Sequence, residues 1–170
     1  MLIVGLAPGM KGANRTGRPF TGDYAGDLLY STLAKYGFSK GTFKADPKDG
    51  LELVDARIAN AVRCLPPENK PLPAEFAACR PFLQSELPAM PNLEIILALG
   101  KGAHDQVLRA LNVKPASKYP FIHARLHDLP NGLKLADSYH CSRYNTNTGR
   151  LTTEMFHNVF AGIRRVLVPR

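Results

Sequence analysis

Residues 93–100, Leu-Glu-Ile-Ile-Leu-Ala-Leu-Gly, constrain the fold more than any other stretch of this sequence. Most of these residues are apolar and consecutive instead of alternating with polar ones, which is typical of a strand buried inside a sheet. Residues 1–6 form a similar apolar run that leads into Pro8 and Gly9, so they read as a buried strand followed by a loop. We predict two further strands, within residues 53–64 and over residues 133–140.

Helical patterns alternate with these strands. The first helix begins near Asp23, which caps it or neighbours the cap, and Gly37 ends it. The helices are predicted over residues 28–36, 75–87, 104–111 and 155–167, and residues 118–131 form an antiparallel or irregular edge. This alternation predicts an α/β fold, a three-layer sandwich whose central, mostly parallel four-stranded sheet is flanked by helices. Because no linker or internal repeat interrupts the pattern, residues 1–170 are expected to form a single domain.

Three polar loops each follow a predicted strand at its C-terminal end. They are the glycine-rich residues 9–26, the proline-rich residues 66–71 and the polar residues 141–150. In open α/β sheets the ligand crevice lies outside these strand ends, so the three loops indicate a site.

The charge balance favours a polyanionic partner. Lys and Arg number 22 against 14 acidic residues, a net charge of +8, although a merely basic surface remains the alternative. The basic residues are spread through loops and form no tail, which favours nucleic-acid binding by a shaped surface. No apolar run approaches the roughly 20 residues of a membrane span, so we expect a cytoplasmic protein. We also expect the protein to be a monomer. Three cysteines without tight spacing argue against a disulfide framework.

Three motifs, in this order, resemble those of the uracil-DNA glycosylase superfamily, and the match is closest to its family 5. They are Gly5-Leu-Ala-Pro-Gly9 with Asn14-Arg-Thr-Gly-Arg-Pro-Phe-Thr-Gly-Asp23, then Ala61-Val-Arg-Cys-Leu-Pro-Pro-Glu-Asn-Lys-Pro71, then Ser138-Tyr-His-Cys-Ser142 with Asn145-Thr-Asn-Thr-Gly-Arg-Leu-Thr152. The resemblance covers nearly the whole chain and implies a parallel sheet flanked by helices. It also implies hydrolysis of the N-glycosidic bond of uracil in DNA, leaving an abasic site, with hypoxanthine or other deaminated bases as further substrates.

The resemblance assigns roles to residues of each motif. Phe20 stacks on the flipped base, Asn69 contacts its edge, and His140 donates a hydrogen bond to the uracil O2 as charge builds there. Asp23 positions the attacking water or stabilises the cationic sugar. Taken alone, these residues have plainer interpretations: a core phenylalanine, a turn asparagine, a structural histidine and a helix cap. The resemblance also implies that Gly5, Ala7, Pro8 and Gly9, at the end of the first strand and in the loop after it, bind the substrate.

DNA contacts are expected from residues around the same loops. The predicted set is Arg15, Arg18, Lys70, Ser142, Arg143, Tyr144, Asn145 and Arg150. Tyr144 is expected to fill the stack that the flipped base leaves. The family has proline after the histidine, whereas this chain has Cys141, which predicts a more flexible loop and a less firmly held His140.

Family 5 holds a [4Fe–4S] cluster with four cysteines, two near the N-terminus and two later. Cys64 and Cys79 match the later pair, whereas this chain begins directly on the first strand and lacks the early pair. No cofactor is therefore expected unless such an early pair is present.

Two rival functions stay open at this point. A lesion-DNA binding protein of the same fold with little turnover is favoured by Cys141. A nucleotide-phosphate cradle after the first strand is the other, although neither common phosphate-binding glycine motif is present.

Overall fold

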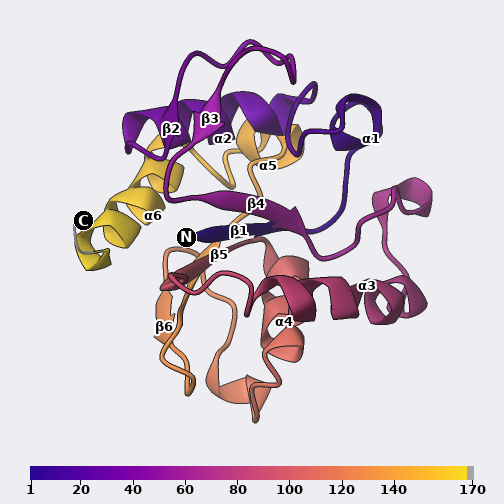
Figure 1. Ribbon diagram of the computed structural model, residues 1–170, viewed down its shortest axis with the longest axis vertical. Helices are drawn as coiled ribbons and strands as arrows, with labels where there is room; N and C mark the ends of the chain where they lie inside the picture. Colours follow the sequence, from indigo (N-terminus) through magenta and orange to yellow (C-terminus); the bar gives the residue numbers. More distant parts are fainter. Residues whose placement is uncertain (168–170) are drawn as a thin grey trace.

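The computed structural model describes residues 1–167, and within them a five-stranded sheet has the order β4-β1-β5-β7-β6 (Figure 1). Its strands are β1 (Leu2–Gly5), β4 (Arg57–Asn60), β5 (Ile95–Leu99), β6 (Leu126–Asp128) and β7 (Lys134–Ser138). β1, β4, β5 and β7 pair in parallel, and β6 pairs antiparallel with β7. The mostly parallel α/β fold is confirmed. The predicted four strands are the parallel ones, and the fifth lies in the segment expected to form an antiparallel or irregular edge.

Helices cover both faces of the sheet and make three layers (Figure 1). One face carries α2 (Tyr24–Lys35) and α6 (Thr153–Val166), and the other carries α3 (Pro73–Glu86) and α4 (Lys101–Ala110). Ile3 belongs to the core on the α2 and α6 side, while Leu2 and Val4 belong to the core on the opposite side. Because consecutive strand residues are buried on opposite faces, these strands need apolar side chains without interruption.

Side chains define where the helices begin. The Asp23 carboxylate caps α2 by accepting from the Gly26 amide, and the Thr152 hydroxyl caps α6 by accepting from the Met155 amide. Pro73 is the first residue of α3. The prediction that the first helix begins near Asp23 is confirmed. The apolar periodicity itself begins a few residues after each observed helix start, since it does not mark the capping turn.

Short elements within the loops were not predicted. They are α1 (Ala13–Thr16), α5 (Arg143–Asn147), the 3-10 turns η1 (Pro67–Asn69) and η2 (Ala116–Lys118), and a two-stranded sheet of β2 (Ser39–Lys40) and β3 (Glu52–Leu53). Each is too short to show a periodic pattern in the sequence.

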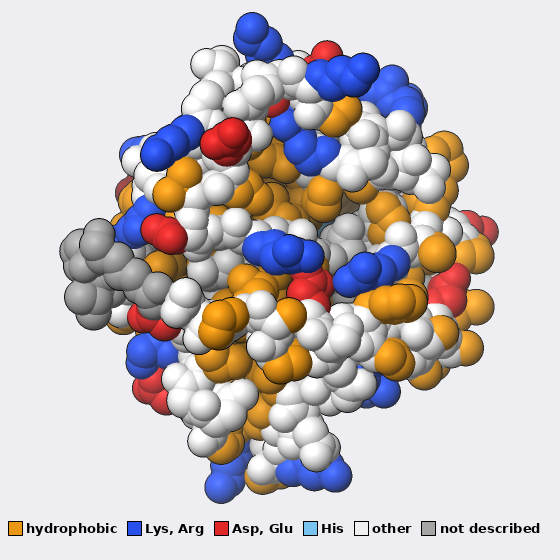
Figure 2. All heavy atoms as spheres, in the orientation of Figure 1, with side chains coloured by type: hydrophobic (Ala, Val, Ile, Leu, Met, Phe, Trp, Pro, Cys, Tyr) orange, Lys and Arg blue, Asp and Glu red, His pale blue; other side chains and the backbone are white. Residues whose placement is uncertain are grey.

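The surface agrees with the dispersed charge seen in the sequence. Lys and Arg side chains lie scattered over the face shown in Figure 2, interspersed with acidic ones. No helix of the described residues is long and apolar enough to cross a bilayer. The last three residues of the predicted single domain, 168–170, lie outside the described part.

Candidate active site

A cavity of about 360 Å³ lies at the C-terminal ends of β1, β4 and β7. Its walls come from the three loops that the sequence indicated, and they bring together residues that are far apart along the chain. The lining residues are Leu6, Ala7, Pro8, Gly9, Ala13, Phe20, Asp23, Ala25, Asn60, Pro66, Asn69, His140 and Ser142. Gly5 lies behind this wall. A Cβ atom there would stand 2.5 Å from Asn60 Oδ1 and 2.9 Å from the Phe20 ring, so only glycine lets both approach.

Phe20 forms one wall of the cavity and belongs to the core as well. It is only 7 % exposed, and its ring centroid lies 5.9 Å from that of His140. Its φ of 53° is in the left-handed region, which is uncommon for a residue with a side chain. The backbone of Gly26 allows this conformation, because a Cβ atom there would stand 1.9 Å from the Phe20 carbonyl oxygen.

Asp23 caps a helix and also lines the cavity. One carboxylate oxygen, Oδ1, accepts from the Gly26 amide at 3.2 Å and caps α2. The other, Oδ2, faces Gly9 and Gly12, where Cβ atoms would lie 3.0 and 2.2 Å from it. Burial raises the pKa of Asp23, and the amides of Gly26 and Ala25 only partly offset this effect. A helix cap therefore also presents a carboxylate at the cavity wall.

His140 follows β7 and lines the cavity. Burial lowers the pKa of its imidazole to about 4, so the ring is neutral near pH 7. Two contacts hold this segment. Asn145 Nδ2 donates to the His140 carbonyl at 2.8 Å, and the buried Cys141 thiol donates to the Ala25 carbonyl at 3.5 Å. Cys141 thus packs the loop against α2, whereas the sequence suggested a loosened loop.

Asn69 stands at the open rim of the cavity. It ends the 3-10 turn η1, and both Glu68 and Asn69 have positive φ, 51° and 57°. Asparagine tolerates this conformation better than most residues, so the turn interpretation is compatible with a place in the cavity lining.

Asn60, the last residue of β4, was not predicted from the sequence to belong to the site. Its Oδ1 is buried without a hydrogen-bond partner among the described residues, and Asn60 lines the cavity. Buried polar atoms without partners are uncommon in folded proteins, so this oxygen marks a place for a hydrogen-bond donor from a ligand. A polar residue at the C-terminal end of a predicted parallel strand was the available signal.

Two of the residues predicted to contact DNA also have side-chain partners within the protein. The Arg18 guanidinium pairs with both carboxylate oxygens of Asp49, each at 2.8 Å. The Asn145 amide nitrogen is bound to the His140 carbonyl. The remaining members lie closer to the surface. Arg15 lies on α1, Lys70 follows η1, and Ser142 caps α5. Tyr144 is 72 % exposed. The guanidinium of Arg143 lies over the ring of Tyr24, and that of Arg150 lies over the ring of Tyr139.

The three cysteines do not by themselves fit a four-thiolate cluster. Cys64 is exposed, and Cys79 on α3 accepts from the Arg63 amide at 3.4 Å. Cys141 is buried, and burial raises the pKa of its thiol to about 12. Because a [4Fe–4S] cluster needs four thiolates, the ligand set of this chain is incomplete.

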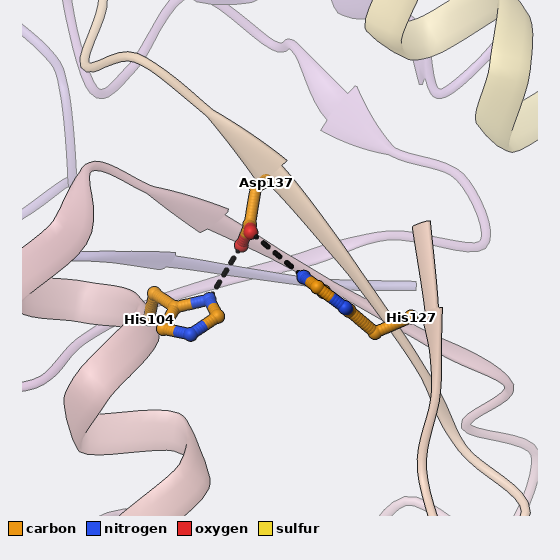
Figure 3. Close-up of side chains that lie close together, drawn as sticks. All are labelled: His104, His127 and Asp137. Carbon is orange, nitrogen blue, oxygen red and sulfur yellow. Dashed lines mark hydrogen bonds and ion pairs between the residues drawn. The ribbon is translucent and has the colours of Figure 1, made fainter. Parts of the chain in front are cut away.

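A second titratable cluster lies outside the cavity (Figure 3). Asp137 on β7 contacts His104 Nδ1 at 2.6 Å through one oxygen and His127 Nε2 at 3.1 Å through the other. His104 Nε2 also donates to the Tyr119 carbonyl at 2.8 Å. These hydrogen bonds account for the grouping of three possible metal-ligating side chains. The prediction that His104 and His127 are structural fits this arrangement.

Comparison with known proteins identifies relatives that match nearly the whole chain. Residues 1–164 match the family model described as the Uracil DNA glycosylase superfamily. A type-5 uracil-DNA glycosylase of Thermus thermophilus is 44 % identical over 166 residues, which cover 98 % of this chain and 75 % of that protein. One from Mycobacterium leprae is 41 % identical over 167 residues, 98 % of this chain and 73 % of the relative. One from Pyrobaculum aerophilum is 38 % identical over 159 residues, 94 % and 68 % respectively.

Proposed function

The chain belongs to the uracil DNA glycosylase superfamily, and we propose that it hydrolyses the bond between uracil and deoxyribose in DNA, leaving an abasic site. The observation that carries this proposal is the single cavity into which three loops bring Phe20, Asp23, Asn69 and His140. The net charge of +8 suits a DNA substrate, and the protein is proposed to act as a monomer in the cytosol.

The base must leave the duplex to reach this cavity. Its ring packs on Phe20. The Asn69 amide accepts from the N3–H of uracil and donates to O4, and an amide held in this orientation does not match the edge of cytosine. The unpartnered Asn60 oxygen is a further acceptor in the cavity; because uracil has no second N–H donor, this oxygen is available to a water molecule bound beside the base. The volume of the cavity alone does not exclude a purine, so hypoxanthine is proposed as a further substrate.

Bond cleavage needs charge stabilisation on both sides of the C1′–N1 bond. The bonding electron pair moves to uracil, and the neutral His140 donates to O2 where negative charge grows. The Asp23 carboxylate stabilises the cationic sugar and orients the water whose oxygen bonds to C1′. The water then loses a proton, and the released uracil gains one.

The test is release of uracil from a duplex, detected as strand breaks after alkali treatment. Strand breaks with the wild-type protein are expected. A shifted band in a binding gel without breaks would instead identify a lesion-binding protein. Duplexes with uracil, hypoxanthine, xanthine and mismatched thymine, compared side by side, measure which base is preferred.

For the cofactor, we propose that the 170-residue chain alone holds no iron–sulfur cluster. The incomplete thiolate set supports this, since Cys64 and Cys79 are the only cysteines that are not fully buried. Purified protein should be colourless and free of stoichiometric iron. About four iron atoms per chain, with broad visible absorbance, would contradict the proposal.

A further inference from the structure

The ion pair between Arg18 and Asp49 does not line the cavity, yet it lies beside the loop that carries Phe20. We propose that this pair is a positioning element for the Phe20 ring, an inference that rests on the proposed function. Through Asp49, the segment between β2 and β3, which lies outside the five-stranded sheet, would then help to position a residue of the active site.

The carboxylate of Asp49 is buried, and both of its oxygens are hydrogen-bonded. Its side chain is 0 % exposed, and four donors surround its carboxylate. Arg18 donates through Nη1 and Nη2 at 2.8 Å each, and the amides of Lys44 and Leu51 donate at 2.9 Å each. The hydrogen bonds from Arg18, above all, hold the pKa of Asp49 well below its ordinary value. The carboxylate is therefore ionised across the physiological range and fixes the guanidinium in one orientation.

Arg18 connects Asp49 to the loop that carries Phe20. Its Nε donates to Thr21 Oγ1 at 2.7 Å, and Thr21 is completely buried. On the other side of Phe20, the Tyr30 hydroxyl donates to the Pro19 carbonyl at 2.7 Å. The residues before and after Phe20 are thus both held by side chains of this cluster.

An aromatic pair supports the guanidinium. Tyr30 and Phe43 stack with centroids 4.4 Å apart, and the Arg18 carbon Cζ lies 5.3 and 5.4 Å from the two centroids. Phe43 comes from the same β2–β3 segment as Asp49. One segment therefore supplies both the carboxylate and one ring that restrain Arg18.

The conformation of Phe20 gives these restraints a function. A phenylalanine at positive φ is in a sparsely populated backbone region, and such a residue persists only where its surroundings determine it fully. If the restraint is lost, the backbone relaxes and the ring leaves its place beside His140. Misplacement of a catalytic surface by about 1 Å can lower a rate by roughly 100-fold.

The first test follows the Phe20 ring itself and does not depend on enzyme activity. The eight phenylalanines are labelled with 4-fluorophenylalanine, and the Phe20 fluorine resonance is assigned by its loss in Phe20→Leu. Asp49→Asn should shift and broaden this resonance. The control variant Asp105→Asn, which removes an exposed ion pair with Lys101, should leave it unchanged. An unchanged resonance in folded Asp49→Asn overturns the proposal, whether or not the protein releases uracil.

The second test asks whether Asp49 acts through Phe20. We expect single-turnover uracil release to fall about 10- to 100-fold in Asp49→Asn, with unchanged affinity for undamaged duplex. In the Phe20→Leu background the same substitution should add little, because effects on one chain of contacts are not additive. Equal losses in both backgrounds would mean general destabilisation and would overturn the proposal. If Asp49→Asn does not fold, Arg18→Lys replaces it, since lysine keeps the charge but loses the bidentate contact.

Discussion

Two histidines, His104 and His140, lie next to strand β7, and they differ in which of their atoms are hydrogen-bonded within the protein. His104 is buried with both ring nitrogens bonded to acceptors, the Asp137 carboxylate and the Tyr119 carbonyl. His140, just beyond the end of the same strand, is held by its backbone carbonyl, and burial alone shifts its pKa. This difference separates polar groups that stabilise the fold from polar groups that are free to bind a ligand. Fully bonded groups fix the structure, and the cavity holds groups such as Asn60 Oδ1 that have no protein partner.

The largest expected effect is on stability, from Asp137→Asn. Both ring nitrogens of His104 face acceptors, so its imidazole is a cation when Asp137 is ionised. Removal of one partner leaves a buried charge uncompensated, which should lower the free energy of unfolding by about 3–5 kcal/mol. Urea denaturation measures this change. A loss below about 1 kcal/mol, as found for exposed ion pairs, would mean that the network is not a buried charge pair.

The matching substitution in the cavity should affect catalysis instead. His140→Ala should lower uracil release by about 10²–10³-fold, because the donor acts mainly on the charge of the transition state. DNA affinity should stay nearly unchanged. His157→Ala, which alters a histidine that contacts Lys35 away from the cavity, serves as the control. Wild-type rates in His140→Ala would remove His140 from the mechanism.

A smaller effect is expected from Asn69→Asp at the cavity rim. The amide donor to O4 is lost, and a negative charge is placed near the leaving uracil anion, so uracil release should slow and the choice of base should change. Asn131→Asp makes the same charge change in an exposed turn and should be neutral. Unchanged rates and base preference would reduce Asn69 to a turn residue.

The pH dependence of stability distinguishes the two histidines further. Burial alone would lower the pKa of His104, but the hydrogen bond and charge of Asp137, with the Tyr119 carbonyl, raise it overall. The stabilisation from His104 should therefore be complete below its unfolded pKa near 6.5 and should be lost as pH rises through its raised folded pKa. Unfolding free energies of wild type and His104→Gln, measured from pH 6 to pH 9, should converge at the alkaline end. A difference that widens with pH would contradict the raised pKa.

The smallest expected effect concerns one phosphate contact. DNA affinity should fall steeply with salt because a surface with net charge +8 displaces counterions. Arg143→Ala should make the slope of log affinity against log salt shallower by about one unit. Arg109→Ala on α4 is the control and should keep the wild-type slope. An affinity that does not depend on salt would refute the electrostatic argument.

The alternation of strands and helices and the three loops at the strand ends follow from the residues themselves, because apolar periodicity, capping and turn chemistry are properties of neighbouring residues. The group of Phe20, Asp23, Asn69 and His140 was predicted from the resemblance of three motifs to a known family. Which polar groups have a hydrogen-bond partner within the protein could be seen only in the folded structure. Arg18 meets Asp49 across 31 residues and His104 meets Asp137 across 33, while Asn60 meets no partner within the described residues. The charge of an arginine is the same whether it faces DNA or a buried carboxylate, so its role depends on the three-dimensional position of its partner.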